Sequence, residues 1–246
     1  MNTSDPYEID GISTQLNLNG KSWQASHEYL ALDYFRENLT TPVTNGDLHT
    51  LQTGFKKDIN YAAANNLNWG ILPTLAVSSN QLKNPDKIKS SSFRLEGHLA
   101  WQLRLQNKIS IFAGACATAV TGDYELIPLA GIEYQYSHWG MTIAYPKTRL
   151  EYLINPGLTV FSSWELAGNQ WQVLDKNLQN RNDVHLASKQ IKLGFRVNII
   201  SSGMIDAYWI HHYDQEIEYL ARNNSLVSTT MDNTNGWMLR YTHLMQ

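Results

Sequence analysis

A strict alternation of apolar and polar residues runs from Phe93 to Leu105 and constrains the fold more than any other feature of the chain. Every odd position is apolar or glycine, whereas the even positions hold Arg94, Glu96, His98, Ala100, Gln102 and Arg104. Successive side chains of a β-strand point to opposite faces, so this pattern predicts a strand with one apolar and one polar face. The run is longer than the ~5–6 residues of an ordinary strand. It is long enough for a membrane-barrel strand, which needs about 9–11 residues.

The same period-two pattern recurs and predicts about twelve strands. We expect them at 23–36, 47–60, 66–78, 91–106, 108–121, 125–137, 139–145, 148–155, 157–174, 184–200, 203–222 and 236–246. The segment 157–174 counts as one strand only if a β-bulge lies at Gly168-Asn169. Short connections alternate with mostly longer ones, as in outer-membrane barrels. The predicted fold is therefore all-β, an up-and-down antiparallel transmembrane β-barrel of about 12 strands, and counts of about 10–14 also fit the pattern.

One domain accounts for the chain. We expect residues 23–246 to form a single β-barrel domain, and residues 1–22 to be an N-terminal segment, either a tail or an extra strand. No fixed-period repeat and no Pro-rich linker divides the sequence.

Composition excludes several classes of protein. Charged residues make up 17% of the chain, against about 25% in average soluble domains. No apolar run approaches the roughly 18–20 residues of a membrane helix, so a helical membrane protein is excluded. The net charge of -3 argues against a broadly basic nucleic-acid surface. The single cysteine, Cys116, can form neither an internal disulfide nor a Cys-rich zinc cluster.

The strand pattern fits two architectures that differ in which face is wet. In a soluble barrel the apolar face lies inside, whereas in a membrane barrel it meets lipid and the polar face lines the lumen. Charges of both signs on the polar faces and aromatic residues near strand ends favour the membrane barrel. We therefore predict that the lumen is lined by Arg94, Glu96, His98, Arg104, Glu133, Arg149, Glu151, Lys192, Arg196 and Arg240.

About half of the chain, from Phe93 to Tyr219, resembles a known family. The residues that carry the resemblance are Trp139 to Lys147 (WGMTIAYPK), then Arg149 to Tyr152, Asn155-Pro156 and Leu158 to Val160. They are similar to an uncharacterised bacterial family of outer-membrane β-barrels, the DUF6268-type proteins, in which a strand ends in a Pro-Lys turn. The resemblance implies a barrel and the outer membrane. It implies no catalytic residues.

Three groups of residues are candidates for a catalytic or metal site. Ser137 and His138 are adjacent, so on a strand they would point to opposite faces and could not act as a nucleophile and its base. They also lie in an expected short turn, and a turn motif is the better interpretation. His212, Asp214 and Glu216 share a face at period two, which would suit a metal ion or a proton relay, although a polar rim near a loop is the simpler interpretation. Arg94, Glu96 and His98 also share a face, and there charge pairing across the lumen is simpler than acid–base catalysis. We predict no catalytic residue, no metal site and no cofactor.

The expected role follows from the barrel. Residues 1–8 contain no positive region and no apolar region, so the chain shows no signal peptide; we expect either a cytoplasmic protein or an export signal encoded upstream of Met1. The favoured prediction is a bacterial outer-membrane protein, structural or a passive channel for small solutes. It would contact outer-membrane lipid, lipopolysaccharide and, during biogenesis, the barrel-assembly machinery, and no nucleic acid. The alternatives are a membrane-embedded lipid-modifying enzyme and a soluble all-β ligand-binding barrel.

Overall fold

The computed structural model describes residues 9–19, 23–34, 46–62, 64–106, 108–174, 181–199, 203–220 and 226–244, and these are almost entirely β-strand. The strands are β1 (Ile9–Asn19), β2 (Trp23–Tyr34), β3 (Gly46–Ala62), β4 (Asn65–Ser78), β5 (Phe93–Gln106), β6 (Ile109–Thr118), β7 (Glu125–Tyr136), β8 (Trp139–Tyr145), β9 (Lys147–Asn155), β10 (Leu158–Leu174), β11 (Arg181–Ile199), β12 (Gly203–Leu220), β13 (Leu226–Met231) and β14 (Thr234–Leu244). Within these ranges, no helix is long and apolar enough to cross a membrane.

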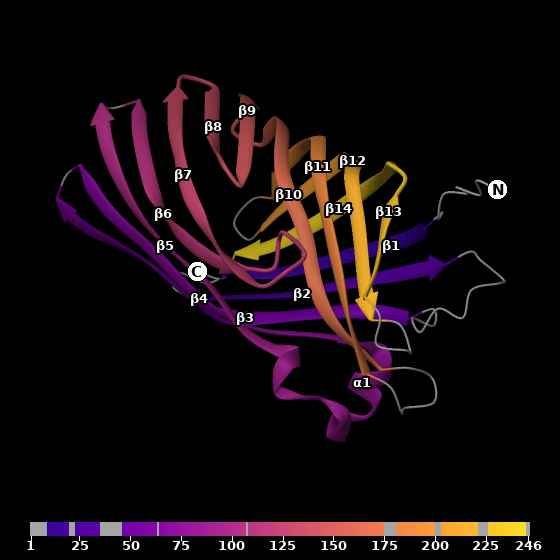
Figure 1. The fold of residues 1–246 in the computed structure, drawn as a ribbon. Coiled ribbons are helices and arrows are strands. Elements are labelled where there is room, and N and C mark those ends of the chain that lie inside the picture. The colour runs from indigo at the N-terminus through magenta and orange to yellow at the C-terminus, as the bar shows by residue number, and fades with distance from the viewer. Residues whose placement is uncertain are drawn as a thin grey trace.

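The strands close into one up-and-down barrel, as predicted (Figure 1). Each strand from β1 to β12 pairs antiparallel with the next in sequence. Both β13 and β14 pair with β12, along Gln215–Leu220 and Gly203–His212 respectively, so they share one position in the wall. The fourteen described strands thus occupy thirteen positions. An odd number makes the first and last strands run in the same direction, and β1 and β14 accordingly pair in parallel.

All twelve expected strands are present with ends within a few residues of the prediction, and the structure adds two. The expected connection at 223–235 contains β13, whose Thr229 and Thr230 are β-branched residues that favour strands. The segment Ile9–Asn19 forms β1 and lies between β2 and β14. The expected bulge at Gly168 is wrong, because the register between β10 and β11 has no shift there.

Helical structure occurs in the described chain only between β4 and β5. The expected polar connection at 79–90 holds α1 (Ser79–Lys83) and two 3-10 turns, Pro85–Lys87 and Ser90–Ser92. These elements lie beyond one end of the barrel in Figure 1. The buried Gln81 donates to Gln172 Oε1 at 2.9 Å, which ties α1 to β10. This is the end of the barrel with the long connections.

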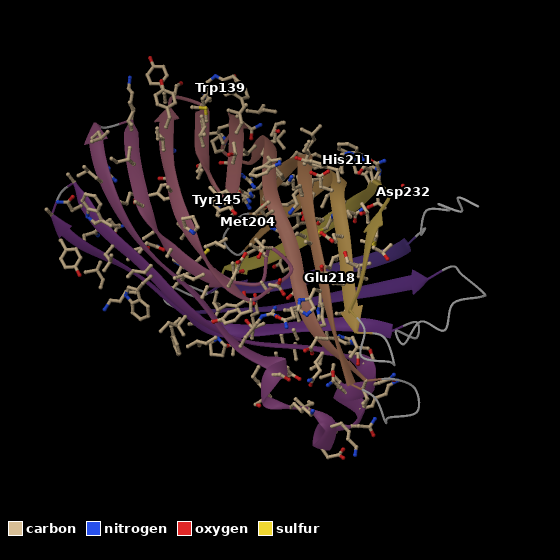
Figure 2. The ribbon with its side chains drawn as sticks, in the orientation of Figure 1. Trp139, Tyr145, Met204, His211, Glu218 and Asp232 are labelled. Atoms are coloured by element: carbon tan, nitrogen blue, oxygen red, sulfur yellow. The ribbon has the colours of Figure 1, made fainter. Side chains whose placement is uncertain are left out.

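The outer face of the barrel is apolar over most of its height. On β5 the outward residues include Phe93, Leu95 and Leu99, each more than half exposed, and on β14 Trp237 is 82% exposed. Aromatic residues gather on this face beside the short turns: Tyr61, Tyr136, Trp139 and Tyr152. Trp139 lies at the end of the strands opposite α1 (Figure 2). The outside of this barrel therefore carries many exposed apolar side chains, with aromatic residues gathered at the edge beside the short turns.

Candidate functional site

The polar face of the strands forms the inside of the barrel. Directly paired residues share a face of a sheet, and the register places ten predicted lumen residues on the face opposite the exposed apolar side chains. They are Arg94, Glu96, His98, Arg104, Glu133, Arg149, Glu151, Lys192, Arg196 and Arg240. Their partners divide these residues into three groups: a network around Arg94, a charged wall on β9 to β12 and β14, and a solvent-exposed group toward the short turns, which we call the wet end.

A network centred on Arg94 links β5 to β3 and β10. Arg94 Nε donates to Glu96 Oε1 at 2.6 Å, Nη1 donates to the carbonyl oxygen of Gln170 at 2.6 Å, and Nη2 donates to Asn169 Oδ1. Gln52 Nε2 donates to the other oxygen of Glu96 at 3.1 Å. Strands β3, β5 and β10, which are not neighbours in the sheet here, are thereby joined through the interior. Asn169 and Gln52 were not predicted, because uncharged amides carry no distinctive signal in an alternating pattern.

The second group is a wall of ion pairs on β9 to β12 and β14. Arg149 Nε donates to Glu151, and Arg196 binds Asp206 through two nitrogens at 2.7 and 3.0 Å.

Glu165 completes this wall. It accepts from Lys192 and lies 2.6 Å from Lys147 Nζ. Neither Glu165 nor Lys147 was predicted to line the lumen. Glu165 lies two residues after Ser163, and Lys147 lies two residues before Arg149, so each shares a strand face with a lumen residue. The alternation of polar and apolar residues is weak at both places, so the pattern did not identify them.

The remaining predicted residues lie on the other wall, toward the short turns. His98 Nε2 donates to Asn68 Oδ1 at 2.5 Å, and Gln102 Nε2 donates to Glu133 Oε2 at 2.7 Å. Arg104 is exposed although it faces inward. Asp58 on β3 is exposed in the same way. Exposed polar side chains on an inner face mean that solvent enters the lumen from the short-turn end.

The opposite end of the lumen holds an apolar cluster that was not predicted. Its buried members come from six strands: Leu48, Ala76, Trp171, Val173, Val184, Ile217 and Met231. Trp171 is 3% exposed, and its Nε1 donates to Thr50 Oγ1 on β3 at 3.1 Å, beside the point where β10 pairs with β4. The described inner face of the barrel is thus charged toward the short turns and apolar beneath the long connections, and we call this apolar cluster the seal.

The polarity of the wall reverses where this seal begins, as β11 illustrates. Toward the short turns the inner residues of β11 are charged, as with Lys192 and Arg196. The outer residues there are apolar, as with Leu193 and Phe195. Toward the long connections the inner residues of β11 are apolar, as with Val184 and Leu186. The outer residues there are polar, as with His185 and Lys189. The pairing of β11 with β10 is continuous across this point, so no bulge in that pair has swapped the faces. One strand therefore changes from an apolar-out to a polar-out pattern along its length.

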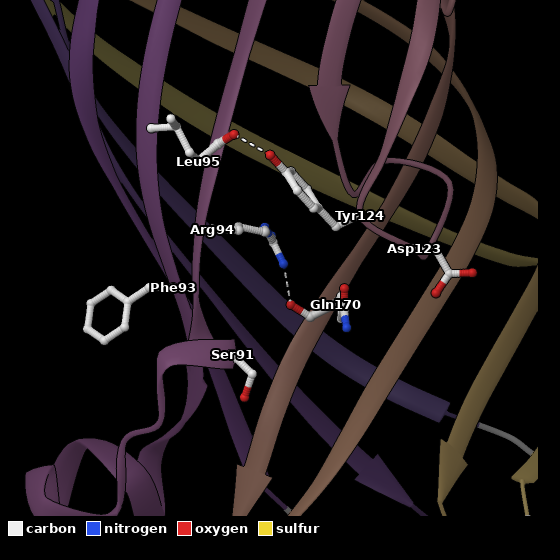
Figure 3. Close-up of a pocket in the computed structure, with 7 residues that line it drawn as sticks. All are labelled: Ser91, Phe93, Arg94, Leu95, Asp123, Tyr124 and Gln170. Carbon is white, nitrogen blue, oxygen red and sulfur yellow. Dashed lines mark hydrogen bonds between the residues drawn. The ribbon is translucent and has the colours of Figure 1, made fainter.

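The wall has a pocket of about 640 Å³ just beyond the β8–β9 hairpin (Figure 3). It is lined by Ser91, Phe93, Arg94, Leu95, Asp123, Tyr124 and Gln170. Because β9 begins opposite Glu165, β10 has no paired strand on that side from Leu166 to Trp171, until Gln172 pairs with Val77 of β4. Arg94 binds the Gln170 carbonyl, and the Tyr124 hydroxyl donates to the Leu95 carbonyl. These two side chains satisfy strand edges that would otherwise lack partners.

Gly168 explains why the loop before β7 can cover this gap. A Cβ added at Gly168 would lie 2.7 Å from the carbonyl oxygen of Val120 and 2.9 Å from the amide nitrogen of Gly122. Only glycine allows the loop to approach β10 so closely. The close approach of this loop, and not the expected β-bulge, therefore accounts for a glycine at this position.

The other candidate groups do not assemble into sites. Ser137 and His138 lie in the β7–β8 turn, where Ser137 Oγ and His138 Nδ1 are 3.0 Å apart and exposed, and Ser137 has φ 54°. The expected turn is therefore confirmed, and no carboxylate is hydrogen-bonded to His138 among the described contacts.

The expectation that His212, Asp214 and Glu216 share a face is wrong. A register shift opposite Ala187–Lys189 and a positive φ of 48° at Asp214 turn Gln215 inward, so Asp214 and Glu216 are exposed while His212 lies against Gln190. In the described ranges, no group of three His, Cys, Asp or Glu residues is placed to hold a metal ion.

Comparison with known proteins adds no relative. No family model, no curated protein and no solved structure matches the chain.

Proposed function

We propose that this chain is a bacterial outer-membrane β-barrel that takes small solutes into a charge-lined lumen and passes them when its apolar seal opens. The observation that carries the proposal is the reversal of polarity along β11. An apolar-out segment suits lipid, and a polar-out segment with an apolar interior suits water. The boundary between them would mark the membrane surface.

Strand lengths support the same division. A membrane strand needs about 9–11 residues, whereas β10, β11 and β12 have 17, 19 and 18. The excess falls in the part with the reversed pattern, beyond the β8–β9 hairpin. That part would project from the bilayer as a water-exposed rim that carries the long connections.

Exposed apolar area argues in the same direction. Monomeric soluble proteins rarely expose apolar patches larger than about 300–600 Å². Here large apolar side chains are exposed on the outer faces of neighbouring strands, such as Leu126 on β7, Ile143 on β8 and Leu150 on β9. A ligand-binding barrel in solution would hide these side chains inside.

The accessible end of the lumen gives the direction of solute entry. Short turns of outer-membrane barrels lie in the periplasm, so the wet end would be open to that compartment and the seal would face outward. Outer-membrane lipid and lipopolysaccharide would surround the apolar band, and the barrel-assembly machinery would insert it. Membership of the uncharacterised outer-membrane family stays a prediction.

The proposal is tested by solubility and by solute flux. We expect the protein to need detergent, and to migrate on gels as a compact form that heating converts to an unfolded one. In lipid vesicles we expect small-solute flux well below that of an open porin, and an increase when the seal is weakened. A monodisperse protein in buffer without detergent would overturn the membrane assignment, and unchanged flux after weakening of the seal would overturn the proposed route.

A further inference from the structure

An aromatic pair in the charged half of the lumen is surrounded by cations. Phe161 on β10 and Tyr208 on β12 are 5% and 2% exposed, and their ring centroids lie 6.0 Å apart, edge to face. The Arg149 guanidinium lies 4.1 Å from the centroid of Phe161. Lys192 Nζ and the Arg240 guanidinium lie 5.4 and 5.6 Å from the centroid of Tyr208. Three positive side chains from β9, β11 and β14 therefore converge on one aromatic pair.

The carboxylates of this wall do not balance its cations. The inward cations described on β9 to β12 and β14 are Lys147, Arg149, Lys192, Arg196 and Arg240. The inward carboxylates of these strands are Glu151, Glu165 and Asp206. Lys147 is 48% exposed, so four buried cations face three carboxylates, and one buried cation is in excess among the described side chains. A buried charge without a partner is costly, so such an excess calls for a bound anion.

Unused hydrogen-bonding groups lie in the same cluster. Within the described part of the chain, Arg149 Nη2, Arg240 Nε and Ser163 Oγ are buried and have no hydrogen-bond partner. Ser163 is 3% exposed and is paired with Arg149 on one side and Lys192 on the other. Buried donors are nearly always bonded in folded proteins, so three unused groups in one cluster point to an acceptor other than the described side chains.

Arg240 differs from its neighbours in having no carboxylate partner among the described residues. Its Nη2 donates to the Tyr208 hydroxyl at 3.0 Å, and the neighbouring Asp206 is occupied by Arg196. A guanidinium presents several N–H groups in one plane and suits the two oxygens of an oxyanion. Arg240 is thus the cation best placed to bind an incoming anion.

We propose that Arg149, Lys192, Arg240 and Ser163 form a binding site in the lumen for an oxyanion, the carboxylate or phosphate group of a small solute. The inference deepens the proposed function, because it names the class of solute that the lumen takes. Arg149 and Arg240 would each donate to the anion, Ser163 would donate from its hydroxyl, and Lys192 would contribute charge. The aromatic pair would hold the three cations apart from one another.

The test measures binding to the folded, detergent-solubilised protein by titration calorimetry. The probes are inorganic phosphate and acetate, with choline chloride as the control for salt. We expect phosphate or acetate to bind and to compete with each other, and choline chloride to give no saturable signal. We expect Arg240→Gln to weaken binding about tenfold or more. Arg104→Gln, which removes the same charge from the exposed end of the lumen, should change it less than about twofold.

A smaller substitution keeps the test valid if Arg240→Gln does not fold. Ser163→Ala removes one hydroxyl and should weaken binding about threefold while the heat-modifiable compact form remains. Absence of binding to the wild-type protein, or equal affinities of wild type and whichever of Arg240→Gln and Ser163→Ala folds, would overturn the site. These readouts need no membrane and no flux, so failure of the anion site is distinguishable from failure of the proposed transport role.

Discussion

Replacement of Arg94 by methionine should destabilise the barrel strongly, because it leaves a buried carboxylate without its partner. The side chains of Arg94 and Glu96 are 9% and 11% exposed, and Arg94 also binds Asn169 and Gln170. Removal of one member of a buried ion pair costs about 3–5 kcal/mol. We expect Arg94→Met to lie in the upper half of that range, because two further acceptors lose their donor.

The double variant separates the orphaned charge from the lost contacts. Arg94→Met combined with Glu96→Gln removes the charge that the single variant leaves buried, so it should be more stable than Arg94→Met alone, by about 1–2 kcal/mol. Arg104→Met is the matched control, since Arg104 is exposed, and should change stability by less than about 0.5 kcal/mol. Urea unfolding in detergent, followed by tryptophan fluorescence, gives the free energies. The reasoning fails if Arg94→Met is no less stable than Arg104→Met, or if the double variant loses as much as the two singles together.

Three further substitutions test other parts of the structure. Gly194→Ala should cost about 1–3 kcal/mol of unfolding free energy, because its Cβ would lie 2.3 Å from Tyr208 Cβ, whereas Gly236→Ala, with no atom closer than 3.5 Å, should be tolerated; equal urea midpoints would contradict this. Leu99→Arg should cost about 2–4 kcal/mol in lipid vesicles if Leu99 faces lipid, and a loss under about 0.5 kcal/mol would speak for a soluble barrel. Trp171→Ala should cost about 3–5 kcal/mol and raise the conductance in planar bilayers, and an unchanged conductance would show that Trp171 is not part of the seal.

The strands could be predicted because alternation is a local property of the sequence. On β5 the side chains of Arg94 and Leu95 differ in polarity and occupy opposite faces, and this alone predicts the strand and the two residue sets that share its faces. Nothing non-local is needed for that step. The ion pairs are harder, since the partner of Arg196, for example, is Asp206 on the next strand and depends on the register.

The seal could not be predicted, because alternation reports only that two faces differ. Trp171 and Val173 alternate with Gln170 and Gln172 as regularly as lipid-facing residues alternate with lumen residues. Along β10 the apolar residues change from the outer face to the inner face. The position of this change depends on where the strand extends beyond the apolar outer surface of the barrel, which the local sequence does not give. The β13 strand was missed for a related reason: it is short and completes a position already partly filled by β14.

The parallel seam between β1 and β14 links the closure of the barrel to the completion of the chain. Leu16 pairs with Tyr241, so the two halves of the seam come from near opposite ends of the sequence. Until β14 has been made, β1 presents an edge of free N–H and C=O groups, and such edges pair readily with other chains. Contacts of this sequence separation also form late in folding. The nascent barrel must therefore be kept from self-association for as long as its last strand is missing, and loss of either end would open the whole wall rather than remove a single strand.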